Sequence, residues 1–217
     1  MSALAVINEN QSSSTPLPKV RSPEKSSPKT LTRYASESVT CEAFTDIYRD
    51  DINIAIWQRK LSDELALAAD EIVKTGATLK LAEVVTPTNV HTRLSNALGA
   101  TSPVMKLSDD ITLLVDMFCC LFDLKGAGLR LTALDRAMCP RFHFDRIPCR
   151  LVTTYQGLAT QWLPNHLVDR TKLGAQSQGK SDEQSGLFHS PDDIWKEIPI
   201  SRTYNRERFM NSNKLIR

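Results

Sequence analysis

The alternation of apolar and polar positions predicts that regular structure begins near Ala43 and combines strands with helices. In residues 52–57 the isoleucines occupy every second position, which is typical of a strand with one apolar face. Residues 62–76 instead carry apolar side chains at helical spacing, and Ser62 stands where an N-cap residue belongs. The pattern therefore predicts a strand followed directly by a helix.

A second long helix is predicted from Ser108, another N-cap candidate, to Leu124. Its apolar residues cover more than one face, so it is expected to be the central buried helix. A short helix or turn is expected at residues 89–99. Further strands are predicted at residues 77–85, 128–136, 139–146, 148–157 and 159–164.

These elements predict an α+β protein, with two main helices packed on an antiparallel, jelly-roll-like sheet in the C-terminal half. Residues 1–39 are rich in Ser, Pro and Lys and are expected to form a disordered tail, because they carry too few apolar side chains to order themselves. Residues 40–198 are expected to form a single globular domain. Residues 199–217 are expected to form an irregular, basic C-terminal tail.

Composition narrows the partners that the chain could have. The net charge of +2 and the aromatic content of 6% give no sign of nucleic-acid binding. The most apolar run, Ile111 to Leu124, contains two aspartates and is too short to span a membrane. The start of the chain has no signal-peptide pattern, and five cysteines without a CxxC pair favour reduced thiols. A soluble, cytoplasmic protein without nucleic-acid or membrane partners is therefore expected.

Candidate chemistry concentrates in the segment from Cys139 to Asp145. In a strand, Arg141, His143 and Asp145 would share one face, and the phenylalanines between them would point to the core. An imidazole and a carboxylate two residues apart can bind one ion, as in non-haem iron oxygenases, and these ligand types suit Fe(II) or Zn(II). His143 and Asp145 are therefore the predicted metal ligands.

A metal site of this kind needs a third ligand, and the candidates are His91, His166, His189 and Cys139. The alternative is structural: Asp145 would accept a hydrogen bond from His143 or pair with a neighbouring arginine. Cysteine catalysis, with Cys139 activated by His143, is a further alternative. The sequence contains none of the serine-hydrolase, phosphate-loop or dinucleotide motifs.

The run CPRFHFDRIPCRLVTTYQGLATQWLP, at residues 139–164, resembles the hallmark block of the proteins grouped as domain of unknown function 1826. The upstream DIYRDDINIAIWQR and the downstream LVDRTKLG are also similar, and the resemblance extends over residues 43–198. It implies a bacterial protein with a role in zinc homeostasis. A zinc-linked GTPase metal chaperone is the partner that it implies.

The chain departs from the family pattern in two places. Gly157-Leu158-Ala159-Thr160 stands where the family has Gly-Pro-Gly-Thr. Family members also continue past the position of Ile198 with further strands and a histidine, whereas this chain runs into SRTYNRERFMNSNKLIR. The expectation is a truncated or frame-shifted C-terminus that lacks the distal histidine and leaves a sheet edge uncovered.

Two functions are consistent with the sequence. The first is a metal-dependent, dioxygenase-like enzyme in which His143 and Asp145 hold the metal and Arg141 or Arg150 pairs with an anionic co-substrate. The second is a non-catalytic accessory protein that binds a metal or a partner, with a structural His/Asp network. A solvent-open, apolar pocket around His143 would favour the enzyme, and a filled interior would favour the accessory protein.

Overall fold

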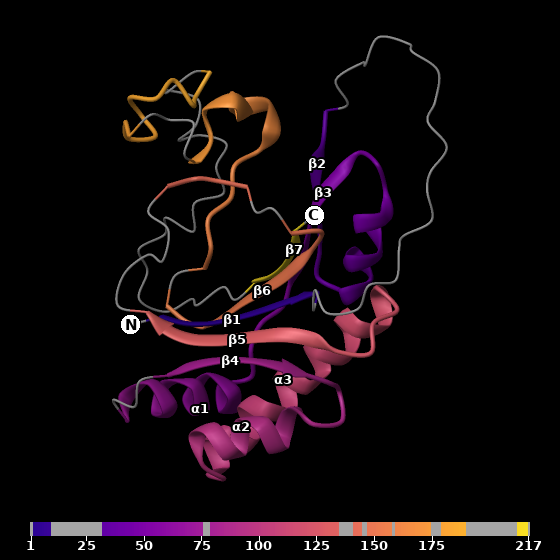
Figure 1. Cartoon of the computed structure of the whole chain (residues 1–217), viewed down its shortest axis with the longest axis vertical. Helices are drawn as coiled ribbons and strands as arrows, with labels where there is room; N and C mark the ends of the chain where they lie inside the picture. Colours follow the sequence, from indigo (N-terminus) through magenta and orange to yellow (C-terminus); the bar gives the residue numbers. More distant parts are fainter. Residues whose placement is uncertain are drawn as a thin grey trace.

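A computed structural model describes residues 2–9, 32–75, 79–134, 141–144, 147–157, 159–174, 179–189 and 212–216. The strands of these residues are β1 (Ser2–Glu9), β2 (Tyr34–Ser38), β3 (Ile52–Gln58), β4 (Lys80–Val85), β5 (Ala127–Leu134), β6 (Arg150–Gln156) and β7 (Ser212–Ile216). They form one seven-stranded sheet in the order β2-β3-β7-β6-β1-β5-β4 (Figure 1). Neighbouring strands are antiparallel except for the parallel pair β2 and β3.

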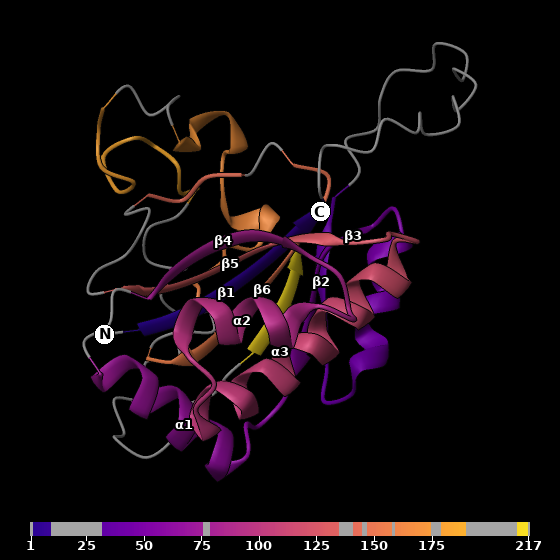
Figure 2. The same ribbon diagram turned by 60° about the horizontal axis from the view of Figure 1, so that its bottom comes forward.

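The α-helices of the described residues are α1 (Asp63–Lys74), α2 (Val90–Leu98) and α3 (Ser102–Leu121). They lie together on one face of the sheet, as Figures 1 and 2 show from two directions. Helices on one face of a largely antiparallel sheet make this an α+β fold, as the sequence predicted. The described strands lie in a single sheet, however, and not in the two facing sheets of a jelly roll.

Helix α1 begins where its sequence predicts. The hydroxyl oxygen of Ser62 accepts a hydrogen bond from the backbone N–H of Leu65, and acidic residues follow in the first turn. Helix α3 begins about two turns before its predicted start, with Thr101 at the N-cap and Pro103 in the first turn. Ser108 is therefore not an N-cap. It lies buried inside the helix, where its hydroxyl donates to the carbonyl of Val104.

Helix α3 supplies much of the core. Its buried residues follow helical spacing along one stripe, namely Val104, Leu107, Ser108, Ile111, Leu114, Val115, Phe118 and Cys119. The core cluster also includes residues of β1, β3, β4, β5 and β6. Helix α3 is therefore buried along one stripe only and is not the all-round buried helix that the sequence predicted, because its other face is exposed, with Leu113 47% exposed. None of the helices in the described segments is long and apolar enough to cross a membrane.

The predicted disordered tail is wrong for two segments. Strand β1 lies inside the sheet between β5 and β6, and β2 pairs with β3. Ala5 and Ile7 of β1 are completely buried in the core. Local composition could not reveal this, because an eight-residue strand gains its stability from hydrogen bonds and packing against strands more than a hundred residues away. Residues 10–31 of the predicted tail lie outside the described residues.

The predicted irregular C-terminal tail is also wrong in part, because Ser212–Ile216 form β7 between β3 and β6. Residues 190–211 lie outside the described residues. Within the described sheet, β6 therefore has a partner on each side, and the outer strands are β2 and β4. Gly157, with φ of +87°, ends β6 in a backbone conformation that favours glycine.

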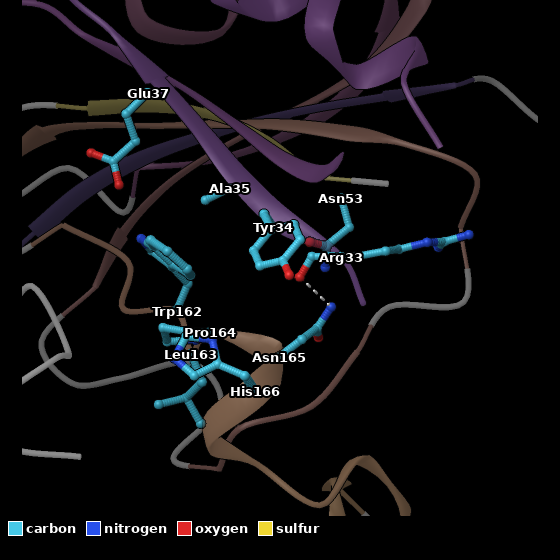
Figure 3. Close-up of a pocket in the computed structure, with 10 residues that line it drawn as sticks. All are labelled: Arg33, Tyr34, Ala35, Glu37, Asn53, Trp162, Leu163, Pro164, Asn165 and His166. Carbon is cyan, nitrogen blue, oxygen red and sulfur yellow. Dashed lines mark hydrogen bonds between the residues drawn. The ribbon is translucent and has the colours of Figure 1, made fainter. Parts of the chain in front are cut away.

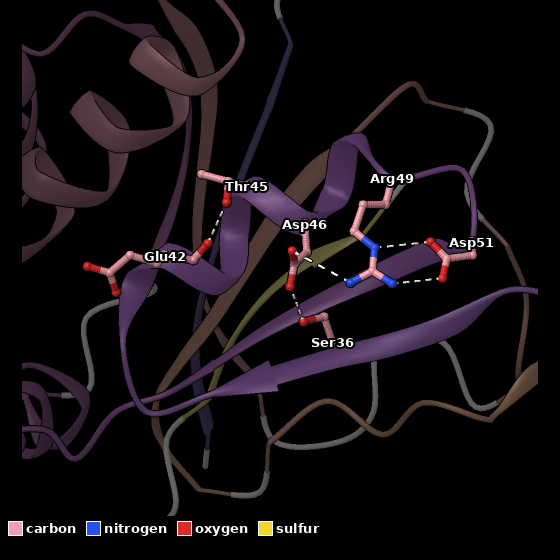
Figure 4. A network of polar contacts seen from close by, with 6 residues as sticks. All are labelled: Ser36, Glu42, Thr45, Asp46, Arg49 and Asp51. Atoms are coloured by element: carbon pink, nitrogen blue, oxygen red, sulfur yellow. Dashed lines mark hydrogen bonds and ion pairs between the residues drawn. The ribbon is translucent and has the colours of Figure 1, made fainter.

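A 3-10 helix, η1 (Cys41–Tyr48), connects β2 to β3 and packs Phe44 edge-on against Trp57. Figure 4 shows the polar network beside it, in which Ser36 donates to Asp46. Arg49 forms two hydrogen bonds with Asp51. Hydrogen bonding to this guanidinium lowers the pKa of the Asp51 carboxyl. Because these charges are exposed, the network orients the turn more than it stabilises the fold.

The described irregular segments of residues 141–144, 159–174 and 179–189 lie on the opposite face of the sheet (Figure 1). They contain two short 3-10 helices, η2 (Asn165–Leu167) and η3 (Arg170–Lys172). A small apolar cluster holds them together, formed by Val168, Leu173 and Leu187 with Phe142, Leu163, Leu167 and Phe188 packed against it. The predicted strand at residues 159–164 is wrong, since its described residues are irregular and end at Pro164, which has no N–H to donate.

Candidate functional site

An open cleft of about 300 Å³ lies between the β2–β3 edge of the sheet and residues 162–166 (Figure 3). The rings of Trp162 and Tyr34 line it from two walls, and the Glu37 carboxylate lies above the indole. Trp162 is half-buried, whereas Tyr34 is 53% exposed. This volume is at the lower end of the range for small-molecule sites.

Hydrogen bonds hold the two walls of this cleft in place. The side-chain amide of Asn165 donates to the carbonyl of Arg33 at 3.0 Å, which ties the Trp162 wall to the start of β2. The amide of Gln58 on β3 donates to the Glu37 carboxylate at 2.5 Å. The guanidinium of Arg33 points away from the two rings (Figure 3). The lining of the cleft combines the Tyr34 and Trp162 rings with two asparagine amides, the Glu37 carboxylate, His166 and apolar side chains.

The predicted metal ligand His143 does not lie on a strand. Residues 141–144 are irregular, and His143 is exposed. The prediction of a strand through residues 139–146 is therefore wrong for these four residues. They have no sheet neighbour among the described strands and are held instead by contacts with Gly174, Gly179 and Asp182.

Those loop contacts fix the backbone on both sides of Phe142. Its N–H donates to the carboxylate of Asp182 at 3.0 Å, and its carbonyl accepts from the N–H of Gly174 at 3.0 Å. Arg141 donates from Nη2 to the carbonyl of Gly179 at 2.7 Å. His143 Nδ1 lies 3.0 Å from the carbonyl oxygen of Arg141. His143 is therefore held at a defined place, although it is solvent-exposed.

The other predicted metal residues are spread over the fold. Asp145 and Cys139 lie outside the described residues. His91 lies on α2 among the helices, with Nε2 3.1 Å from Asp109. His166 belongs to η2 beside the cleft, and the backbone N–H of His189 donates to Leu167. Across the segments that the structure describes, no three His, Cys, Asp or Glu side chains are grouped closely enough to hold a metal.

The two arginines predicted to bind a co-substrate lie on different elements. Arg141 contacts Gly179 in the loop, as above, and Arg150 begins β6, where its side chain is half-buried. Arg150 pairs in the sheet with Asn8 of β1 and Ile216 of β7. Binding of an anionic co-substrate by either arginine stays a prediction.

A buried polar cluster, formed by Arg59, Asp110 and Tyr155, lies on the helix side of the sheet. Both terminal nitrogens of Arg59 donate to the Asp110 carboxylate at 2.6 Å, and the Tyr155 hydroxyl donates to the same carboxylate at 2.7 Å. The Arg59 and Asp110 side chains are 11% and 10% exposed, and Arg59 also lies 5.0 Å from the ring centre of Trp57. This cluster joins the end of β3 to α3 and β6.

Tyr155 is protected from ionisation. Burial raises the pKa of its hydroxyl well above the ordinary value, and the negative charge of Asp110 acts in the same direction. In the unfolded chain this tyrosine ionises near pH 10. The neutral Tyr155 hydroxyl therefore makes its full contribution to the unfolding free energy below about pH 10. This contribution is lost as the pH rises toward the pKa of Tyr155 in the folded protein.

We accordingly expect Tyr155→Phe to flatten the alkaline decline in stability. Above pH 10, the unfolding free energy of the wild type should fall more steeply than that of the variant, by up to about 1.4 kcal/mol per pH unit. Urea unfolding between pH 8 and 11, followed by circular dichroism, measures both slopes. Equal slopes would show that Tyr155 ionises in the folded state as readily as in the unfolded chain.

The sequence reasoning missed both the aromatic cleft and the buried polar cluster. Tyr34 fell in the expected tail, and no local pattern marked Trp162 or Trp57 as site residues. Arg59 and Tyr155 lie in segments that carry the family resemblance. This resemblance was the one indication in the sequence that these two residues matter. Asp110 falls in the first turn of the helix predicted from Ser108, and no local pattern identifies its partners, which are 51 and 45 residues away.

Comparison with known proteins identifies a family without adding a function. A model described as a protein of unknown function (DUF1826) matches residues 38–193. No curated protein matches the chain, and no solved structure matches it. The matched range contains Arg59, Asp110, Tyr155, His143 and Trp162, but it begins after Tyr34 and Glu37. Since this range covers well over half of the sequence, the chain belongs to the DUF1826 family.

Proposed function

We propose that this protein binds one divalent transition-metal ion, Fe(II) or Zn(II), with His143 and Asp145 as two of its ligands. The observation that supports this most directly is the position of His143. Its ring is exposed to solvent, and its Nδ1 lies 3.0 Å from a backbone carbonyl oxygen. Ligand histidines characteristically donate one ring N–H to such an acceptor, which fixes the tautomer and leaves Nε2 as the lone-pair donor.

The surrounding loops fit this proposal. The two hydrogen bonds of Phe142 and the contact of Arg141 with Gly179 limit the movement of the backbone that carries His143. A preorganised ligand loses less entropy on binding than a mobile one. Asp145 follows two residues later and would supply the carboxylate. The bound ion would supply Lewis-acid or redox chemistry at open coordination positions.

His166 and His189 are the preferred candidates for the third ligand. His166 belongs to η2, and His189 follows Phe188, which packs in the same apolar cluster as Phe142. His91 fits less well, because it belongs to α2 and contacts Asp109 of α3. The proposed site therefore lies in the irregular segments on the face of the sheet opposite the helices.

The wider role that we propose is linked to zinc homeostasis. In the enzymatic form of the proposal, the protein is dioxygenase-like, and Arg141 or Arg150 pairs with an anionic co-substrate. In the accessory form, the protein binds metal without catalysis and associates with a zinc-linked GTPase metal chaperone. His143 is exposed, so its position favours neither the pocket expected of an enzyme nor the filled interior expected of an accessory protein. Metal binding, which both forms share, is therefore the first property to test.

The first test is a titration of the whole chain with Zn(II), and with Fe(II) under anaerobic conditions, by calorimetry. We expect one-to-one binding by the wild type and at least about tenfold weaker binding by His143→Ala and by Asp145→Ala. His91→Ala is the matched control and should bind like the wild type. The absorption spectrum of a Co(II) complex would report the ligand set independently, and His166→Ala and His189→Ala would identify the third ligand.

The proposal would be wrong if His143→Ala bound metal as tightly as the wild type, or if the wild type bound none. In either case His143 and Asp145 would be structural residues. If metal binds, oxygen uptake by the Fe(II) complex with an anionic co-substrate separates the enzymatic form from the accessory form.

A further inference from the structure

The cleft between β2 and residues 162–166 is lined by aromatic rings and an acidic side chain, which is a different set of groups from the proposed metal ligands. The phenol and indole rings that line it belong to Tyr34 and Trp162, and Glu37 is the acidic residue among its lining residues. A tyrosine that is 53% exposed at the first position of an outer strand leaves aromatic surface in water beside a concave site. A ligand that covered this ring would bury that surface.

We propose that this cleft binds a small organic cation of the quaternary or methylated ammonium class. The faces of indole and phenol rings attract a cation through their negative quadrupole, and the Trp ring is the strongest of these partners. Glu37 adds a negative charge at the same opening, whereas the Arg33 guanidinium points away from it (Figure 3). An anionic ligand would meet the Glu37 carboxylate, and a neutral aromatic ligand would gain nothing from that charge.

The cleft is preorganised for such a ligand. Asn165 fastens the Trp162 wall to the backbone of Arg33, and Gln58 holds the Glu37 carboxylate by a hydrogen bond. Parallel pairing with β3 orients β2, which carries Tyr34 and Glu37. The rings and the carboxylate therefore need little reorganisation before binding, which favours affinity for a small ligand.

This site does not depend on the proposed metal. His143 is not among the residues that line the cleft, and no metal ligand is needed to attract an ammonium group. Tyr34 and Glu37 also precede the range matched by the family model, so one wall of the cleft comes from residues outside that range. Binding of an organic cation should accordingly be unchanged in His143→Ala.

The test compares choline with dimethylbutanol, its neutral carbon isostere, by calorimetry and by indole proton shifts in nuclear magnetic resonance spectra of the whole chain. We expect choline to bind one-to-one and its isostere to bind at least about tenfold more weakly, because only the cation gains the attraction to the rings and to Glu37. Trp162→Leu and Tyr34→Leu should each weaken choline binding at least about fivefold. Tyr34→Phe keeps the ring and should stay within about twofold of the wild type.

The charge of the site is tested with a matched pair of glutamates. Glu37→Gln should weaken choline binding about threefold or more, and less at high salt, whereas Glu42→Gln, an exposed residue of η1 outside the cleft, should have no effect. Circular dichroism and the melting temperature would verify that each variant is folded. The proposal is overturned if the folded wild type does not bind choline, if the isostere binds equally well, or if Trp162→Leu binds choline like the wild type.

Discussion

The variant Ile7→Asp is expected to lose its cooperative fold. Ile7 is completely buried, and its neighbours across the sheet are Leu129 of β5 and Leu151 of β6, which are buried as well. Removing the aliphatic side chain costs about 2–5 kcal/mol, and placing an unpaired carboxylate in the core costs several kcal/mol more. The sum is comparable with the whole stability of a domain, which is about 5–15 kcal/mol.

Urea unfolding monitored by circular dichroism measures this effect, with Ile7→Val as the matched control. The valine variant should lose only about 0.5–1.5 kcal/mol, because one methylene is removed from an otherwise intact core. This pair of variants separates a central strand from a disordered tail. If Ile7→Asp unfolded at the same urea concentration as the wild type, β1 would not belong to the sheet in solution.

Asp110→Asn is expected to destabilise the protein by about 3–5 kcal/mol, the usual cost of removing one partner from a buried ion pair. Asp110 receives two hydrogen bonds from Arg59 and one from Tyr155. An amide of the same shape cannot neutralise the Arg59 guanidinium, so a buried charge is left without a counter-charge. Chemical unfolding at pH 7 measures the change in unfolding free energy.

The neighbouring Asp109→Asn is the control, because Asp109 is 72% exposed and its contact is with His91. Its effect should be below about 1 kcal/mol. A second variant tests the cause of the loss: adding Arg59→Met to Asp110→Asn should recover part of the stability, because it removes the uncompensated charge. If the two substitutions were simply additive, the loss in Asp110→Asn would not arise from the unpaired guanidinium.

Neither strand β1 nor the buried Arg59–Asp110–Tyr155 cluster can be predicted from a local sequence pattern. Strand β1 has apolar residues but is followed by a long Ser- and Pro-rich stretch, so local composition argues against order. The Arg59–Asp110–Tyr155 cluster has no local pattern at all. Both depend on partners that are distant in the sequence.

Local signals, in contrast, were sufficient for several elements. The alternating isoleucines of β3 and the Ser62 cap of α1 each express a preference that acts within a few residues. The apolar segments that became α2, β4, β5 and β6 were also predicted close to where they lie. The start of α3 was misplaced because Ser108 has the residue type of an N-cap, whereas Thr101 and Pro103 provide the actual first turn.

The sequence by itself therefore determined the α+β class, most of the helices and strands, and the family. Only the tertiary structure decided that residues near both ends of the chain enter the sheet, that residues 141–144 form a loop, and that Trp162 faces Tyr34 across a cleft. The physical reason is the range of the interactions. Caps and hydrophobic periodicity act over one or two turns, whereas strand pairing, buried ion pairs and clefts arise from contacts whose partners no local pattern identifies.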